Sequence, residues 1–195
     1  MNDPLEGTDD AATPLTSDEQ QDLIPSYISL RRELNEAEQA NILEAEEWAF
    51  ARQRNVLDLQ FLTALHKRMF GRVWRWAGKF RDTERNIGVA PALIRPELQQ
   101  LVDDCGYWIK AGTYAPDEIA ARFHHRLTLI HPFPNGNGRH ARLATDLLLV
   151  SLGRPRFSWG RENLVDATQT RMIYVASLRA ADKHDLNPLL DFVRS

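Results

Sequence analysis

Apolar residues in this chain recur at the spacing of an amphipathic helix over most of its length. They fall at i, i+3, i+4 and i+7, so each stripe lies on one face of a helix and can be buried against its neighbours. Glycine and proline stand between the stripes, where they end one helix and begin the next. The pattern predicts helices at about 35–52, 58–71, 96–109, 116–130 and 136–153, followed by a long and a short helix between Val165 and Val193.

The segment Phe80–Val89 is the exception, because neither helical nor alternating spacing explains it. A short exposed β-hairpin and an irregular loop both fit its composition. The expected fold class is therefore all-α with one small β element. Residues 1–20 are acidic, contain no basic residue and show no apolar periodicity. We therefore expect a flexible N-terminal arm, followed by a single domain at 21–195.

Composition excludes several classes of protein. The 195 residues suit one domain with its own core. With 24 basic and 27 acidic residues the net charge is −3, which argues against a nucleic-acid partner. Cys105 is the only cysteine, so neither an intrachain disulfide nor a multi-cysteine zinc site can form. The sequence has no signal-peptide pattern and no apolar run of membrane-spanning length, so we expect a cytoplasmic protein without a membrane partner.

Residues His131–Asn135 join the fourth and fifth predicted helices through a sharp turn that contains two prolines. Gly136 and Gly138 follow where a helix begins, and glycines there let an anion approach the unpaired backbone N–H groups. Arg139 and Arg142 stand at i and i+3 on one side of this helix start. Two arginines suit a polyphosphate, because each guanidinium can bind oxygens bidentately. The alternative is a plain helix–turn–helix corner with a solvated arginine face.

His131 stands just before the turn, within reach of the same anion. A neutral imidazole there can take the proton of an incoming hydroxyl, and general-base catalysis contributes about 10²–10⁴-fold in rate. A core histidine bonded to a backbone carbonyl is the alternative. A zinc site made from His124, His125, His131 and His140 is disfavoured, because no nearby carboxylate completes a known set of ligands.

Taken together, residues 131–142 resemble the signature of the Fic family (filamentation induced by cAMP). In that signature His-Pro-Phe is followed by a variable residue, an acidic residue, Gly-Asn-Gly-Arg and a second Arg three positions on. Residues 76–81 are similar to the segment that opens the Fic flap. The small size and the acidic arm most resemble the subgroup called mobile mystery protein B. The resemblance implies a Fic-type helical bundle with a small β-hairpin flap over the active site.

The resemblance also implies protein adenylylation, which is the transfer of AMP from ATP to a Ser, Thr or Tyr hydroxyl of a target protein or of the chain itself. His131 would be the base, and Phe133 would anchor the loop in the core. The remaining signature residues would bind the phosphates: Asn137 with the amides near Gly136 and Gly138 at the α-phosphate, Arg139 at the β-phosphate and Arg142 at the γ-phosphate.

Two further groups of residues are implied by the same resemblance. The flap around Arg85, Asn86 and Ile87 would hold the target segment by main-chain pairing. Tyr174 and Asp182, near the C-terminal end of the sequence, are similar to residues that lie close to the adenine.

Asn135 departs from the signature. Fic enzymes carry Asp or Glu at this position, and the carboxylate binds the Mg²⁺ that bridges the phosphates, with Mn²⁺ as an alternative ion. Asn offers only a neutral carbonyl oxygen, whereas Mg²⁺ prefers charged oxygen ligands. We therefore expect weaker metal binding, slower turnover or a changed reaction.

A segment at about 26–36 contains the run Ser-Leu-Arg-Arg-Glu-Leu-Asn from Ser29 to Asn35. It resembles the inhibitory motif of many Fic proteins, in which Ser or Thr is followed four residues later by Glu and then by Gly or Asn. The asparagine arrives one residue late here. The resemblance implies that Glu33 pairs with Arg142 and blocks productive binding of the γ-phosphate. Alternatively, Ser29 or Asn35 caps the following helix and Glu33 is solvated.

Other interpretations of the same site stay open. Doc-type relatives transfer phosphate and replace the second loop glycine with Lys, whereas Gly138 is retained here. Other family members use UTP, GTP or phosphocholine donors, and a glutamate such as Glu33 could position water for removal of AMP. A catalytically weak nucleotide-binding or antitoxin-like interaction module is the non-enzymatic alternative. The target protein and the oligomeric state do not follow from the sequence.

Overall fold

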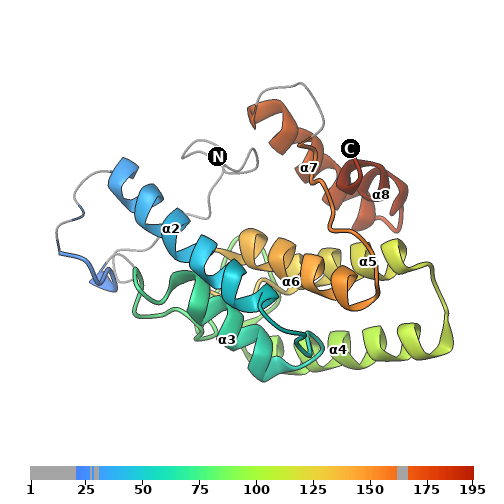
Figure 1. Ribbon diagram of the computed structural model, residues 1–195, viewed down its shortest axis with the longest axis horizontal. Helices are drawn as coiled ribbons and strands as arrows, with labels where there is room; N and C mark the ends of the chain where they lie inside the picture. Colours follow the sequence, from blue (N-terminus) through green and yellow to red (C-terminus); the bar gives the residue numbers. More distant parts are fainter. Residues whose placement is uncertain (1–20, 27, 29–30, 162–166) are drawn as a thin grey trace.

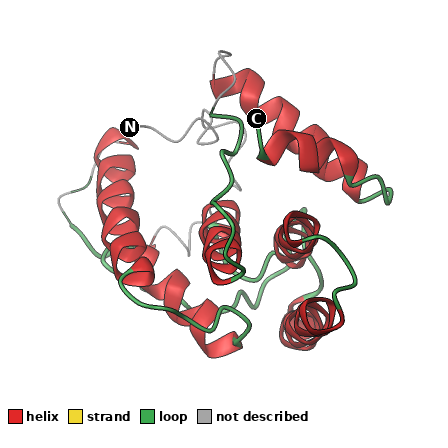
Figure 2. Ribbon diagram, turned by 45° about the vertical axis from the view of Figure 1, so that its right-hand side comes forward, coloured by secondary structure: helices red, strands yellow, loops and turns green. Residues whose placement is uncertain are grey.

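The computed structural model describes residues 21–26, 28, 31–161 and 167–195. The predicted acidic arm and Ser29 lie outside these ranges. The helices of the described part are α2 (Arg31–Phe50), α3 (Leu59–Phe70), the 3₁₀ helix η2 (Pro91–Leu93), α4 (Ile94–Ala111), α5 (Pro116–Ile130), α6 (Asn137–Ser151), α7 (Ala167–Ala181) and α8 (Asn187–Val193). The all-α class is confirmed (Figures 1 and 2), since the β structure of the described residues is limited to one isolated bridge between Leu23 and Trp74.

Helices α5 and α6 form the centre of the bundle. They pack on each other, α4 packs on α5, and α2 packs on α3. The pair α7 and α8 lies on the other side of α5, above it in Figure 1. One apolar core joins α2, α3, α4 and the inner faces of α5 and α6. A second core lies between α5, α6 and the C-terminal pair, so the loop that links α5 to α6 is anchored by helices buried on two sides.

The helix predictions agree closely with the structure. Helix α5 has the predicted bounds, and α3 is capped as expected, since Oδ1 of Asp58 accepts a hydrogen bond from the backbone N–H of Gln60 at 2.9 Å. Helix α2 begins four residues before the predicted Asn35, which places Glu33 in its first turn. Helix α4 begins two residues before Pro96, because η2 leads directly into it and a proline is tolerated in a first helical turn.

The flap differs from the β-hairpin that the family resemblance implies. Residues 79–90 contain no strand and form an irregular loop. The reason lies in its backbone hydrogen bonds, which go to the end of α5 and to the start of the signature loop rather than across the flap. The N–H of Arg81 donates to the carbonyl of Pro132 at 2.9 Å, and the N–H of Val89 donates to that of Ile130 at 3.3 Å. The flap is therefore held against the last residue of α5 and the first residues of the signature loop, on both sides of His131.

Candidate active site

His131 is the residue that ends α5. Its backbone is left-handed (φ 53°), a conformation that costs a residue other than glycine about 1–3 kcal/mol and is common at functional sites. The left-handed turn directs the chain away from the helix into Pro132 and Phe133. The His131 side chain is buried, with 7% of its surface exposed. The fold thus maintains a strained backbone at the predicted base.

The electrostatic environment keeps the His131 ring neutral. Its pKa is lowered to about 4, by burial first and then by the charges of Arg81 and Arg85, against a hydrogen bond with the Thr128 backbone that raises it. The ring atom Nε2 is buried and has no hydrogen-bond partner among the described residues. A neutral imidazole with a free ring nitrogen is the state that a general base requires.

The loop after His131 is fixed by the side chain of Asn137. Its Oδ1 accepts from the N–H of Phe133 at 2.9 Å, and its Nδ2 donates to the carbonyl of Phe133 at 2.8 Å. The Phe133 ring is buried and stacks on His66 at 3.6 Å between ring centroids. The Asn137 side chain thus fixes the turn through Phe133, and the main-chain N–H of Asn137 is a further donor at the start of α6.

The two signature glycines have different reasons to be glycine. Gly136 is left-handed (φ 75°), and a Cβ there would lie 2.5 Å from the ring of Phe70, so the fold itself requires glycine. A Cβ at Gly138 would meet no atom within 4 Å. Packing therefore does not explain Gly138, and its predicted role at an anion site stays a prediction.

His66 connects this loop to the flap, and sequence reasoning missed it. The N–H of Gly78, where the flap begins, donates to Nδ1 of His66 at 3.0 Å. The ring hydrogen is therefore on Nε2, which donates to the carbonyl of Asn135 at 3.1 Å. Burial, with the neighbouring His140 ring as a smaller cause, lowers the His66 pKa well below its ordinary value. A neutral buried histidine thus joins α3, the flap and the signature loop.

The two signature arginines lie on the first turns of α6. Arg139 donates from Nη1 to Oε2 of Glu38 at 2.7 Å and lies over the ring of Phe70. Oε1 of Glu38 also accepts from Nε1 of Trp74 at 2.6 Å. Sequence reasoning missed Glu38, although a signal was present. Glu38 continues the buried stripe of α2 at Asn41, Ala45 and Ala49, where a charged residue must have a partner.

Arg142 is buried beside the C-terminal part of the fold. The pKa of His124 on α5 is lowered to about 3 and that of Arg171 on α7 is also lowered. In both groups burial is the largest cause and the charge of Arg142 is the second. Two arginines from separate helices therefore lie near each other on this side of the signature loop. Arg171 carries no motif in the sequence, so only the packing of α7 places it there.

Comparison with known proteins agrees with this geometry. Residues 56–149 match the Fic/DOC family model, a range that covers α3, the flap, α4, α5, the signature loop and most of α6. This chain carries a Fic/DOC family domain. It is 32% identical to protein adenylyltransferase fic-1 of Caenorhabditis briggsae over 151 residues, and 30% identical to that of Caenorhabditis elegans over the same length. Each alignment covers 73% of this chain, which spans only 28% of either relative.

Solved structures show the same Fic fold. A Fic-1 fragment from C. elegans superposes with a TM-score of 0.68 at 26% identity, covering 90% of this chain and 51% of the fragment. The N-terminal Fic domain of a Bartonella quintana effector gives 0.70 at 21% identity, covering 90% of this chain and 91% of that domain. The helices of this chain are therefore arranged as in a Fic domain.

The metal position of this Fic domain does not fit a protein-held Mg²⁺. Oδ1 of Asn135 accepts from the N–H of Gly136 at 2.7 Å, and the Asn135 backbone carbonyl is engaged by His66. The described residues contain no cluster of acidic, histidine or cysteine side chains able to hold a metal ion. A neutral oxygen that already accepts a hydrogen bond is a poor ligand for a hard cation.

The residues predicted near adenine lie in two different environments. Tyr174 is buried in the core between α5 and the C-terminal helices, and its hydroxyl pairs with Nε2 of His124 at 2.9 Å. Asp182, just after α7, pairs with Nε2 of His125 at 2.8 Å on the surface. Tyr174 is thus linked to the Arg142 neighbourhood through His124, whereas Asp182 faces the outer side of α5. Their roles toward a nucleotide stay predictions.

The flap residues form the exposed rim of the site. Asn86 and Ile87 are exposed, with 56% of the Ile87 surface accessible, and Arg85 is half-buried beside His131. An exposed apolar residue next to polar and basic neighbours suits contact with a peptide. The role of these three residues in target docking stays a prediction, as does the pairing of Glu33 with Arg142.

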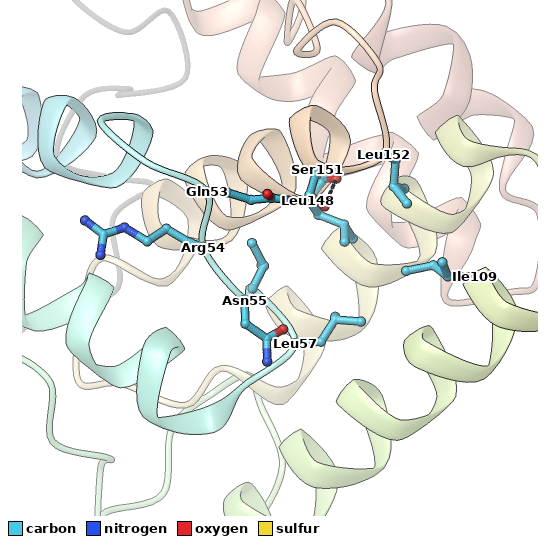
Figure 3. Close-up of a pocket in the computed structure, with 9 residues that line it drawn as sticks. Gln53, Arg54, Asn55, Leu57, Ile109, Leu148, Ser151 and Leu152 are labelled. Carbon is cyan, nitrogen blue, oxygen red and sulfur yellow. Dashed lines mark hydrogen bonds between the residues drawn. The ribbon is translucent and has the colours of Figure 1, made fainter.

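A separate hollow of about 540 Å³ lies at the opposite end of α6 (Figure 3). It is lined from the α2–α3 connection, α4 and the C-terminal end of α6, by Gln53, Arg54, Asn55, Val56, Leu57, Ile109, Leu148, Ser151 and Leu152. At 1.5 Å per residue, α6 separates it from the signature loop by roughly 20 Å. The hollow is therefore not part of this site.

None of the described helices is long and apolar enough to cross a membrane.

Proposed function

We propose that this chain is a protein adenylyltransferase, which transfers AMP from ATP to a hydroxyl group of a protein. The observation that carries the proposal is the position of His131, a buried neutral imidazole with a free Nε2, directly before a glycine-flanked helix N-terminus that carries Arg139 and Arg142. The similarity to the adenylyltransferases of C. briggsae and C. elegans supports it. The BepC protein of Bartonella tribocorum, a structural neighbour with bound AMPPNP, gives further support, because AMPPNP is an ATP analogue.

In the proposed reaction the target hydroxyl oxygen attacks the α-phosphorus of ATP. A new P–O bond forms to the target, the bond from the α-phosphorus to the bridging oxygen breaks, and pyrophosphate leaves. Nε2 of His131 takes the hydroxyl proton. The N–H groups at the start of α6, including that of Gly138, would stabilise the charge that develops on the α-phosphate oxygens. Arg139 and Arg142 would bind the β- and γ-phosphates.

Incubation of the purified chain with α-labelled ATP and Mg²⁺ or Mn²⁺ tests the proposal. The expected result is covalent label on the chain or on a protein of an added cell lysate, with loss of about 10²–10⁴-fold in His131→Ala. His184→Ala is the matched control, because His184 is also a left-handed histidine but is exposed and remote in sequence. Undiminished labelling in His131→Ala, or ATP binding by the wild type without any transfer, would contradict the proposal.

We also propose that the N-terminal part of α2 restrains this activity through Glu33. Glu33 is half-buried in the first turn of α2, and α2 contacts α6, which carries the signature arginines. Elsewhere on α2, Glu38 already pairs with Arg139, so carboxylates of this helix can reach the arginine side of the site. Glu33→Gly should raise self-modification. Glu36→Gly controls for the loss of helix propensity, because Glu36 is exposed on the same turn. An equal gain in both variants would refute a specific role for Glu33.

A further inference from the structure

Arg81 is a buried cation whose hydrogen bonds all go to backbone carbonyls. Only 3% of its surface is exposed, and it makes no ion pair with a described residue. Its Nε donates to the carbonyl of His131 at 2.7 Å and its Nη1 to that of Thr83 at 3.0 Å. Its Nη2 donates to the carbonyls of Val89 and Ile130. A buried charge is costly unless it is fully hydrogen-bonded, so this arrangement needs a reason beyond packing.

These four carbonyls belong to three separate parts of the site. Ile130 and His131 are the last carbonyls of α5, which have no partner within the helix and form its negative end. Thr83 is on the outgoing arm of the flap and Val89 on the returning arm. One guanidinium therefore sets the spacing between the two flap arms and the left-handed residue that carries the base.

Gly88 shows how closely these parts are packed. Its φ of +102° favours glycine, and a Cβ there would lie 2.6 Å from Nη2 of Arg81 and 2.7 Å from Cβ of His131. The returning arm of the flap therefore runs directly over both residues, with no room for a methyl group. A displacement of the flap must move Arg81 or His131.

We propose that Arg81 is a positioning residue that couples a target bound on the flap to the placement of His131, by holding both flap arms and the His131 carbonyl with one side chain. The expected effect of Arg81 on the rate rests on the proposed transfer reaction. A target segment paired to the flap near Ile87 would have its hydroxyl placed relative to Nε2 through this shared guanidinium. Misplacement of a reacting group by about 1 Å can cost roughly 10²-fold in rate.

The charge of Arg81 gives it a second effect on the same ring. Arg81 and Arg85 are the two cations that act on His131, and both favour its neutral form. The carboxylate of Glu84, on the exposed flap, acts on Arg81 only from a distance. Removing the guanidinium should therefore loosen the flap and also raise the pKa of His131, whereas a lysine keeps the charge and loses the planar set of donors.

Two variants separate these effects, with Arg122→Gln as control because Arg122 is an ion-paired arginine on the outer part of α5. In Arg81→Gln, an NMR titration should show the His131 pKa rising above its wild-type value of about 4 while burial keeps it below 6.5, and the acid limb of the rate profile should follow it. In Arg81→Lys the His131 pKa should stay low. In both variants kcat should fall about 10-fold or more while the Kd for ATP changes less than about twofold.

A readout that needs no turnover keeps the inference separate from the proposed function. Hydrogen exchange of the Val89 amide, which is bonded to Ile130, should accelerate in both Arg81 variants and stay unchanged in Arg122→Gln. Gly88→Ala, which keeps the arginine but crowds its Nη2, should reproduce the faster exchange and lower kcat if an Arg81 variant fails to fold. If the wild type transfers no nucleotide, the proposed function fails, while exchange and the His131 pKa still decide the role of Arg81.

Three outcomes would overturn the inference. The first is wild-type kcat in Arg81→Lys, which would show that the donor geometry is unnecessary. The second is an unchanged Val89 exchange rate in Arg81→Gln. The third is a parallel loss of kcat and ATP affinity in proportion to the unfolded fraction, which would indicate a purely structural role.

Discussion

The signature loop and the flap lie side by side over His131, but they are held in opposite ways. The loop is fixed by two buried helices, by both polar atoms of the Asn137 side chain and by the stacked pair His66 and Phe133. The flap has one backbone hydrogen bond to Ile130 at the end of α5, one to Pro132 in the loop, the Gly78–His66 bond at its base and one buried arginine, and its tip is exposed. The part proposed to bind the phosphates is thus held in place before a ligand arrives, whereas the part proposed to meet a protein target is open.

This contrast has a physical reason. Charge that develops during phosphoryl chemistry is stabilised best by dipoles that need no reorganisation, so a rigid helix N-terminus is an advantage. A peptide target brings its own backbone hydrogen bonds, and an edge that is not already paired can accept them. The irregular flap, whose arms do not pair with each other, leaves its main-chain groups available in this way.

The largest effect on stability is expected where the signature loop is anchored. His66→Leu removes the partner of the Gly78 N–H and of the Asn135 carbonyl, leaving two part-buried polar groups without a bond. Each unsatisfied group costs about 1–3 kcal/mol, so we expect the free energy of unfolding to fall by about 2–6 kcal/mol. Urea denaturation measures it. His184→Leu, at an exposed histidine, should change it by less than about 0.5 kcal/mol. A loss below about 1 kcal/mol for His66→Leu would show that the loop is not anchored there.

Low pH should destabilise the fold through the buried histidines in and around the signature loop. Burial is the largest cause that lowers the pKa of His66, His124, His131 and His140, the last two to about 4. Because the unfolded chain binds these protons near pH 6.5 and the folded chain does not, the contribution to stability is complete above pH 6.5. It is lost as the pH falls from 6.5 toward 4. We expect Tm to drop by about 5 °C or more between pH 7 and pH 5, with a smaller drop in His140→Gln. A flat Tm over that range would contradict neutral buried rings.

A matched pair of charge changes compares the two regions directly. Asn135→Asp keeps the oxygen that accepts from the Gly136 N–H and adds a charged ligand, so we expect tighter Mg²⁺ binding in the presence of ATP and a higher rate. The free energy of unfolding should change by less than about 0.5 kcal/mol. Asn86→Asp makes the same change on the exposed flap and should leave Mg²⁺ affinity unaltered. Isothermal titration with ATP measures both, and equal Mg²⁺ affinities would show that position 135 does not contact the metal.

The smallest effect on stability is expected at the flap tip. Ile87→Ser removes an apolar side chain that is 56% exposed, so unfolding should change by less than about 0.5 kcal/mol. Modification of a protein target should nevertheless fall, because this residue is the apolar contact that the flap offers. Met172→Ser, at an exposed position on α7, serves as the control. Reduced labelling in both variants would indicate a general surface effect instead of docking.

Much of this architecture follows from local patterns. The bounds of α5, the Asp58 cap of α3 and the helix start after the signature loop depend on spacing, capping residues and glycine, which act over a few neighbouring positions. The flap could not be decided in the same way. Whether Phe80–Val89 pairs with itself or with the end of α5 depends on where α5 lies, and no short-range pattern carries that information.

The sequence alone was sufficient to locate the helices, the signature loop and the atypical Asn135, because each is a property of adjacent residues. The partners of that loop were decided only by tertiary packing. His66 meets Asn135 across 69 positions, Glu38 meets Arg139 across 101, and Arg81 meets His131 across 50. Burial then set the protonation of His131, the proposed base, because desolvation is a property of the assembled core. The motif therefore specifies which groups are present, and the fold specifies their charge and what holds them.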